Sequence, residues 1–267
     1  MIGIIIAAGM GKRMGKHARM RPKCLLPVAG RTILEHTVEN MCLAGCNKVV
    51  VVTGHLAELI NHPGIIKVHN TNYLNNNILG SMMYARDFLN GPAILSYSDI
   101  WVEQNIYRRL VDTPGDLVLA VDSDWRAYYE NRGDHPIAEA ENAYVRRDNS
   151  LDRIGKHLGD SAPPGMMCGE FLGLWRMSTR GTQIFRDTYD ELNRKLDPSA
   201  PFEHANEWQN AYITDMIQHL VSLGNRFDCA LIERGWAELD TEQDYERLPK
   251  IAAQQRLISI QTADRSI

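Results

Sequence analysis

Two glycines and a run of cations near the start of the chain are the residues best suited to chemistry. Gly9 and Gly11 follow an apolar stretch directly, and a run of cations follows them: Lys12, Arg13, Arg19, Arg21 and Lys23. Glycines let the backbone approach a ligand closely, and exposed N–H groups on such a loop form an anion-binding concavity. The pattern predicts a loop that holds a polyphosphate.

Single residues exclude two familiar phosphate-binding loops. The third glycine of a dinucleotide fingerprint would fall at Met14, and no acidic residue follows the second predicted strand. A P-loop needs Ser or Thr after its Gly-Lys pair, but His17 follows Gly15-Lys16. The loop therefore binds phosphate by another geometry.

Polar residues stand at or just after the ends of three apolar runs, at Thr53, Asp99 and Asp122. In open α/β sheets, ligands bind beyond the carboxyl ends of the strands. We therefore expect Asp99, Asp122 and the glycine loop to share one rim of the sheet.

The apolar runs that must position these residues are nearly continuous in Val, Ile and Leu, which is typical of strands buried on both faces. They are Ile2–Ala7, Lys48–Thr53, Ala93–Tyr97 and Asp116–Asp122. Helical spacing marks Thr32–Ala44 between the first two, with a capping box at Thr32 and Glu35 and a stop at Gly45. This alternation predicts an α/β fold with parallel strands.

The remaining elements follow from the same periodicities. A hairpin is expected from Ala143–Arg147 and Leu151–Lys156, and late strands at Gly169–Met177 and Asp228–Ile232. Further helices are expected at Ser81–Leu89, Gln104–Val111, Ser178–Lys195, Tyr212–Leu223 and Thr241–Ala253. No clean boundary divides the chain. We expect one domain over residues 1–253, an acceptor-side insertion with its hairpin at 123–177, and a C-terminal tail at 254–267.

Composition restricts the partners. A net charge of −4 and a sequence pI of about 6.1 exclude the global basic field of a nucleic-acid-binding protein. No apolar run approaches the ~18–20 residues of a membrane span, and no charged segment precedes the first apolar run as in a signal peptide. We expect a cytoplasmic protein that binds small molecules, neither nucleic acid nor membrane, and that could form a homodimer.

Two separated blocks carry a resemblance to a known family. Ala7–Arg13 reads AAGMGKR, and Pro22–Val28 reads PKCLLPV. In this order they resemble the signature of the nucleotidyltransferases that activate sugars, choline phosphate and phosphonates. The resemblance implies a Rossmann-like three-layer sandwich with a mainly parallel, mixed sheet, of the nucleotidyltransferase or GT-A-like type.

Further segments resemble the cytidylyltransferase branch, which includes choline-phosphate cytidylyltransferases. These segments are Asn75–Ser81, Ser98-Asp99, Cys168–Leu174 and Gly235–Thr241. The stretch from Asp122 to Glu141 is most similar to the phosphonoalkyl cytidylyltransferases of the 2-aminoethylphosphonate type. The family likeness thus implies transfer of CMP from CTP to a small phosphonate, with release of pyrophosphate.

The resemblance also implies roles for individual residues on the nucleotide side. The catalytic residues would be three loop cations that hold the triphosphate: Lys12, Arg13 and Lys23. The nucleotide would further contact the loop backbone and two polar side chains: Ala8, Gly9, Gly11, Asn77 and Ser81. Asp99 and Asp240 would bind Mg²⁺, which prefers carboxylate and phosphate oxygens, although each aspartate could instead cap a helix.

The acceptor side is less defined. Arg132 is the candidate for holding the phosphonate, with Arg126 and Lys156 behind it, because a guanidinium fork matches such oxygens. A quaternary ammonium would need an aromatic cage, whereas a primary ammonium would need a carboxylate. The other candidate acceptor contacts include both kinds: Asp122, Trp125, Glu170 and Asp215.

Three other functions remain open. The enzyme could be a choline-phosphate cytidylyltransferase, or a sugar-1-phosphate nucleotidyltransferase that uses UTP or dTTP. A catalytically idle nucleotide-binding regulator could have the same fold. Retention of the loop cations and of both candidate metal ligands favours an enzyme.

Overall fold

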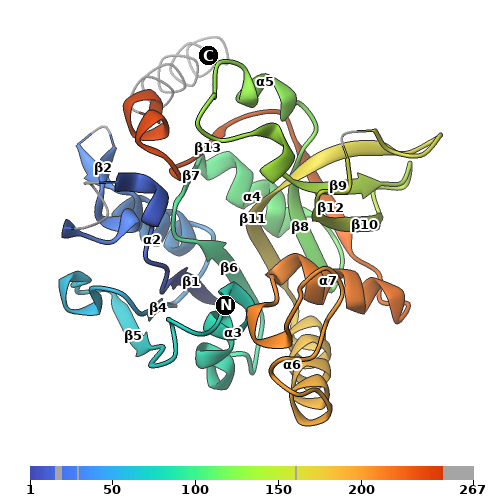
Figure 1. Ribbon diagram of the computed structural model, residues 1–267, viewed down its shortest axis with the longest axis horizontal. Coiled ribbons are helices and arrows are strands. Elements are labelled where there is room, and N and C mark those ends of the chain that lie inside the picture. Colours follow the sequence, from blue (N-terminus) through green and yellow to red (C-terminus); the bar gives the residue numbers. More distant parts are fainter. Residues whose placement is uncertain (16–19, 29, 160, 249–267) are drawn as a thin grey trace.

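The computed structural model describes residues 1–15, 20–28, 30–159 and 161–248. Within them one nine-stranded sheet forms the centre of the molecule (Figure 1). In it, β1 (Ile2–Ala7) lies parallel between β4 (Lys48–Thr53) and β6 (Ala93–Tyr97). These three strands have the predicted bounds. The chain adds β5 (Ile65–His69) parallel to β4, a strand that the apolar runs did not indicate because it is half-exposed.

The other half of the sheet is organised around β11 (Met167–Met177). It runs antiparallel to β6, to β8 (Leu117–Asp122) and to β9 (Glu141–Val145). The predicted hairpin is confirmed: β9 pairs with β10 (Leu151–Lys156) at the sheet edge. Finally, β12 (Asp228–Ile232) pairs parallel with β8. Strands from the 123–177 segment are therefore part of the main sheet.

Helices cover both faces of the sheet, as alternation along the strands requires. Ile5 of β1 packs into a core with α2 (Ile33–Leu43) and α4 (Gln104–Asp112). Its neighbours Ile4 and Ile6 pack on the opposite face. That face is covered by α3 (Ile78–Met82), α6 (Thr179–Lys195) and α7 (Ile213–Ser222). The Rossmann-like three-layer α/β sandwich is confirmed.

Local signals set most helix bounds. The Thr32 side chain accepts from the Glu35 backbone N–H, and Glu35 accepts from the Thr32 N–H, so the predicted capping box is confirmed. The helix predicted at Ser81–Leu89 is wrong in its bounds. Asn77 caps α3 instead, through a bond from the Ile78 N–H, and a 3-10 segment follows at Met83–Phe88.

Short elements complete the fold. These are β2 (Pro27–Val28), β3 (Arg31–Thr32), β7 (Ile100–Val102), α5 (Arg126–Tyr129) and β13 (Trp236–Glu238). The predicted closing helix is present over 242–248; its remainder and the predicted tail lie outside the described residues. Across the described chain, the search for a helix of sufficient length and hydropathy to cross a bilayer finds none.

Candidate active site

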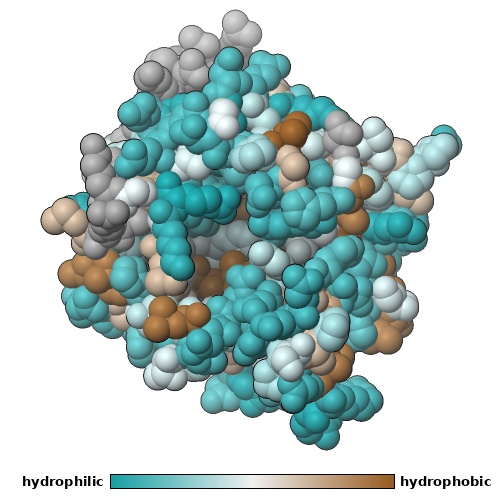
Figure 2. Space-filling view, in the orientation of Figure 1, coloured by the Kyte–Doolittle hydropathy of each residue, from teal (hydrophilic) through white to brown (hydrophobic). Residues whose placement is uncertain are grey.

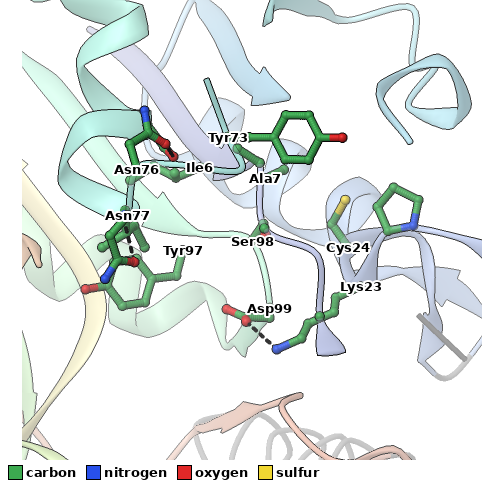
Figure 3. Close-up of a pocket in the computed structure, with 16 residues that line it drawn as sticks. Ile6, Ala7, Lys23, Cys24, Tyr73, Asn76, Asn77, Tyr97, Ser98 and Asp99 are labelled. Carbon is green, nitrogen blue, oxygen red and sulfur yellow. Dashed lines mark hydrogen bonds and ion pairs between the residues drawn. The ribbon is translucent and has the colours of Figure 1, made fainter. Parts of the chain in front are cut away.

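The glycine loop after β1 forms one wall of a cavity of about 190 Å³ (Figure 3). Gly11 has φ = 59°, the left-handed conformation that glycine adopts at no steric cost, and it begins a 3-10 turn at Lys12–Met14. Tyr73, Asn76, Asn77 and Ile78 at the start of α3 also line this cavity. The cavity therefore sits beyond the carboxyl end of β1, where the fold class places ligands.

Lys23 lies at the centre of the site. Its Nζ donates to Asp240 Oδ1 at 2.7 Å and to Asp99 Oδ2 at 3.0 Å, and Arg13 pairs with the other Asp240 oxygen at 2.5 Å. Burial alone would lower the pKa of the Lys23 ammonium, but Asp99 and Asp240 outweigh it and raise the pKa above its ordinary value. The ammonium thus stays charged between two carboxylates.

A two-stranded ribbon brings the two aspartates together. Antiparallel pairing of β7 with β13 sets Ile100 opposite Glu238, and the Leu239 N–H donates to the Asp99 carbonyl at 2.7 Å. Asp99 precedes one strand and Asp240 follows the other, so the two side chains leave the same end of the ribbon. Residues far apart in the sequence are placed beside one ammonium by backbone register.

This pair of carboxylates fits a hard divalent cation. Both side chains reach a single positively charged atom, Lys23 Nζ, within 3.0 Å, and carboxylate oxygens are the protein ligands that Mg²⁺ prefers. His135 and Glu238 add possible ligands, since one ligand atom from each of His135, Glu238 and Asp240 lies within 4.8 Å of the others. The Lys23 ammonium lies between the two carboxylates that would bind such a cation.

His135 is a site residue to which the sequence analysis assigned no role. Its Nε2 lies 3.6 Å from Asp240 Oδ2 and its Nδ1 lies 3.5 Å from Glu238 Oε2. Burial, together with the nearby Arg132, lowers the pKa of His135 to about 4, so the imidazole is neutral near pH 7. Its place beside Glu238 and Asp240 could not be read from the sequence, because these two carboxylates come from a distant part of the chain.

A second cavity, of about 310 Å³, adjoins the first. The residues shared by both linings are Gly9, Lys23, Asn77, Ile78, Tyr97 and Asp99. Figure 2 shows that this face of the molecule is hollowed near its centre, with hydrophilic side chains around the hollow. Two ligands could thus meet beside Lys23 and Asp99.

The second cavity is acidic. Glu141 and Glu170 line it and are buried, and burial raises the pKa of Glu141 to about 7 and that of Glu170 well above its usual value. Lys156 also lines it, 3.4 Å from Glu139 and 5.0 Å from the Tyr212 ring centroid. A positively charged group entering this cavity would lower both pKa values and so favour the ionised form of each carboxyl group.

Of the residues predicted to contact the nucleotide, most line the first cavity: Ala8, Gly9, Gly11, Lys23, Asn77 and Ser81. The Asn77 amide also donates to the Asn210 carbonyl at 3.0 Å, and Ser81 is bonded to Asn70 and Asn76. Arg13 lines the second cavity. Lys12 is exposed and is absent from both linings, as far as the described residues go.

Asp122 and Trp125, predicted to contact the acceptor, have structural positions instead. The Asp122 carboxylate is 0% exposed and accepts a hydrogen bond from the Trp236 indole at 2.7 Å. Trp125 is equally buried, and its indole donates to the Cys168 carbonyl at 3.1 Å. Neither residue lines either cavity. Of the two aspartates predicted at the rim of the sheet, Asp99 lines both cavities and Asp122 lines neither.

Asp215 and Arg126 also lie away from the acceptor side. The Asp215 carboxylate accepts from the Tyr212 N–H at 2.8 Å and from the His204 N–H at 3.2 Å, so it fixes the start of α7. Arg126 is exposed on α5, with its guanidinium carbon 4.7 Å from the Trp125 ring centroid. Among the predicted acceptor contacts, Lys156 and Glu170 are the ones that line the second cavity.

Arg132 is buried in an ion pair and does not line either cavity. Its Nε donates to Asp244 Oδ1 at 2.6 Å, and its Nη2 donates to Asp244 Oδ2 at 2.9 Å and to Glu238 at 3.0 Å. Asp244 in turn accepts from the backbone N–H of Asp240 at 3.1 Å. Arg132 therefore supports the segment that carries Asp240, and the prediction that it grips the acceptor is corrected.

This pair gives a stability prediction. Arg132→Met should lower the free energy of unfolding by about 3–5 kcal/mol, because it leaves Asp244 charged, buried and unpaired. Urea unfolding followed by circular dichroism would measure the loss. The matched control is Arg126→Met on the exposed face of α5, where about 1 kcal/mol or less is expected. Equal small losses in both variants would contradict the structural role of Arg132.

Comparison with known proteins decides the family. The profile of the MobA-like NTP transferase domain matches residues 3–167, more than half of the chain. The chain belongs to this family. The nucleotidyltransferase resemblance carried by the two blocks around the glycine loop and Lys23 is thereby confirmed.

Individual relatives fall in the cytidylyltransferase branch. A CTP:phosphoglutamine cytidylyltransferase of Campylobacter jejuni is 25% identical, over 92% of this chain and 98% of that protein. A CMP-5'-(3-aminopropyl)phosphonate synthase of Streptomyces rubellomurinus is 29% identical, over 80% of this chain and 35% of that protein. The solved CTP:phosphocholine cytidylyltransferase of Streptococcus pneumoniae shares the fold, with a TM-score of 0.71 over 94% of this chain and 99% of that chain at 18% identity.

Proposed function

We propose that this protein is a Mg²⁺-dependent cytidylyltransferase that transfers CMP from CTP to a small phosphonate or phosphomonoester. The observation that carries the proposal is the pair of adjoining cavities that share Lys23 and Asp99. One is walled by the glycine loop, and the other is lined by acidic and aromatic side chains suited to a small polar acceptor. Relatives named for CTP-dependent transfer to phosphorylated and phosphonate acceptors support it.

On the nucleotide side, the glycine loop holds the triphosphate through backbone N–H groups. Lys23 and Arg13 add positive charge where the two cavities meet, while Asn77 and Ser81 stand on the wall where the base and ribose would lie. Lys12, exposed at the loop, would contact the outer phosphates. Phosphoryl-type transfer depends mainly on such positioning and charge neutralisation.

The reaction needs no general base. A phosphonate or phosphate oxygen is an anion at neutral pH, so it attacks the α-phosphorus of CTP directly. A bond forms from that oxygen to phosphorus, and the bond to the bridging oxygen breaks, so that pyrophosphate leaves with the electron pair. Lys23 and Arg13 neutralise the charge that develops on the leaving group, and the neutral His135 is not required for proton transfer.

Asp99 and Asp240 would hold the Mg²⁺ ion, with Lys23 moving from the two carboxylates toward the phosphates. When bound, the ion would supply charge neutralisation at the transferred phosphate. The carboxylates on this side of the site then serve as ligands, and the remaining acids of the second cavity stay available for the acceptor.

The segment 123–177 would supply the acceptor side within one nucleotidyltransferase domain over residues 1–253. Eight of the residues lining the second cavity support this, since they belong to that segment: Tyr129, His135, Glu139, Glu141, Lys156, Glu170, Phe171 and Leu172. Among acceptors, phosphonates of the aminoalkyl type fit the acidic lining better than a sugar phosphate, whose sugar carries no positive charge.

One experiment tests the function. Pyrophosphate release is measured with CTP, UTP, dTTP and ATP, each combined with 2-aminoethylphosphonate, 2-hydroxyethylphosphonate, phosphocholine, phosphoethanolamine and glucose 1-phosphate. We expect CTP with a phosphonate to give the highest kcat/KM. Preference for glucose 1-phosphate with UTP or dTTP would replace the proposal by a sugar nucleotidyltransferase, and no release with any pair would favour a regulator.

A further inference from the structure

Glu170 carries a buried oxygen that the fold leaves without a partner. The side chain projects from β11, lines the second cavity and is only 4% exposed. Its Oε1 accepts a hydrogen bond from the Tyr129 hydroxyl at 2.5 Å, whereas Oε2 has no hydrogen-bond partner among the described residues. A buried carboxylate oxygen without a donor is costly, so a donor from a ligand would be strongly favoured.

The cations around this cavity are already paired with other carboxylates. Lys156 lies 3.4 Å from Glu139, and Lys23 lies between the two aspartates. Arg13, the guanidinium that lines this cavity, pairs with Asp240, and Arg132, outside the lining, donates its Nε and Nη2 to Asp244 and Glu238. The acids facing the cavity therefore outnumber the charges available to neutralise them.

Glu141 is another buried carboxylate of the cavity lining. It accepts a hydrogen bond from the Tyr97 hydroxyl at 3.0 Å through Oε2. It lies on β9, which pairs with β11 so that Asn142 stands opposite Glu170. Neighbouring strand residues point to opposite faces of a sheet, so Glu141 lines the cavity from the face opposite to that of Glu170.

We propose that Glu170 selects an acceptor that bears a primary ammonium group. The ammonium donates one N–H to Glu170 Oε2, while the phosphonate or phosphate end of the same molecule points to Lys23. This inference rests on the proposed function, since it names the acceptor class for that same site. Glu170 is then a specificity-determining residue and takes no part in bond making.

A quaternary ammonium fits this cavity less well. It has no N–H to give to Glu170 Oε2, and it would need open aromatic faces. The rings that line the cavity already pack against protein groups. Lys156 Nζ lies 5.0 Å from the Tyr212 centroid, the Arg132 guanidinium lies 5.3 Å from that of Tyr129, and the ring of Tyr128 lies 4.9 Å from that of Trp236.

The test compares two acceptors that differ in the ammonium alone, 2-aminoethylphosphonate and propylphosphonate. With wild-type protein we expect kcat/KM to favour the amino compound by about 10–100-fold, the usual range for a hydrogen bond to a charged group. In Glu170→Gln this preference should fall below about threefold, through a higher KM for the amino compound. The kcat and KM for propylphosphonate should change little, which a general loss of structure would not allow.

Two further variants sharpen the result. Tyr129→Phe removes the hydroxyl but leaves the carboxylate, so the preference for the amino compound should persist. If a protonated Glu170 donated to the acceptor instead, Gln would keep that donor and Glu170→Gln would retain the preference. That outcome would overturn the proposal, as would equal use of both acceptors by wild type or a preference for phosphocholine.

A binding measurement separates this inference from the proposed function. Calorimetric titration of the same two phosphonates into wild-type and Glu170→Gln protein reports the preference without turnover. Suppose that wild type binds the amino compound more tightly, that Glu170→Gln loses this preference, and that no CMP transfer is detected. This result would contradict the proposed function and leave the role of Glu170 intact. Equal binding of both compounds by wild type would overturn the role of Glu170.

Discussion

Lys23→Met is expected to lower kcat/KM for CMP transfer by about 10²–10³-fold, the usual cost of losing one preorganised group that stabilises developing charge. Lys23 lines both cavities, and its side chain is only 13% exposed, so solvent cannot replace its ammonium. Methionine has a similar length and no charge. Pyrophosphate release at saturating CTP and Mg²⁺, with varied acceptor, measures the loss.

The control for Lys23→Met is Lys48→Met. Lys48 is exposed at the start of β4, so this variant loses the same charge away from both cavities and should turn over like wild type. Thermal unfolding of both variants checks that the fold persists. A Lys23→Met protein that is folded and turns over at a near-normal rate would remove this ammonium from the mechanism.

Asp99→Asn and Asp240→Asn should each lower turnover by at least about 10²-fold, because a metal ion contributes several kcal/mol to the stabilisation of developing charge. Each variant should also weaken the binding of Mn²⁺ to the protein with CTP present, measured from the free-ion signal in electron paramagnetic resonance. Asp112→Asn, at the exposed end of α4, is the matched control and should change neither quantity.

Lys23 gives an independent check on the same site. Its Nζ bonds to both aspartates, at 2.7 Å and 3.0 Å, and would compete with a cation for them. Lys23→Met should therefore bind Mn²⁺ more tightly than wild type when CTP is absent. Unchanged Mn²⁺ binding in this variant and in both aspartate variants would show that the metal binds elsewhere.

Local patterns in the sequence predicted the parts of the fold that depend on neighbouring residues. The buried strands read as unbroken Val and Ile runs, since strands covered on both faces have no polar side. The Thr32–Glu35 capping box and the glycine loop after β1 likewise depend on residues within a few positions of one another. The half-exposed strand β5 has no unbroken apolar run to mark it. The start of α3 was missed although its cap is local, because the stretch Asn75–Asn77 and Ser81 offer several possible caps.

On the acceptor side, local sequence patterns did not predict which charged residues face the cavity. Arg132 and Asp122 looked like exposed loop and rim residues, and both are buried in polar contacts with the segment around Trp236–Asp244. A charged residue in a loop has the same sequence signal whether it faces solvent, a ligand or a distant carboxylate. Only the packing of that late segment against residues 122–135 distinguishes these cases.

The sequence by itself determined the family and the α/β architecture, because these reside in contiguous motifs, and it predicts a polyphosphate-binding loop at Gly9–Lys23. The tertiary structure decided which charges meet. Register between β7 and β13 sets Asp99 and Asp240 around Lys23, and the pairing of β9 with β11 leaves Glu170 facing the cavity with an open oxygen. Such contacts join residues far apart along the chain, so their distances and burial are properties of the folded molecule alone.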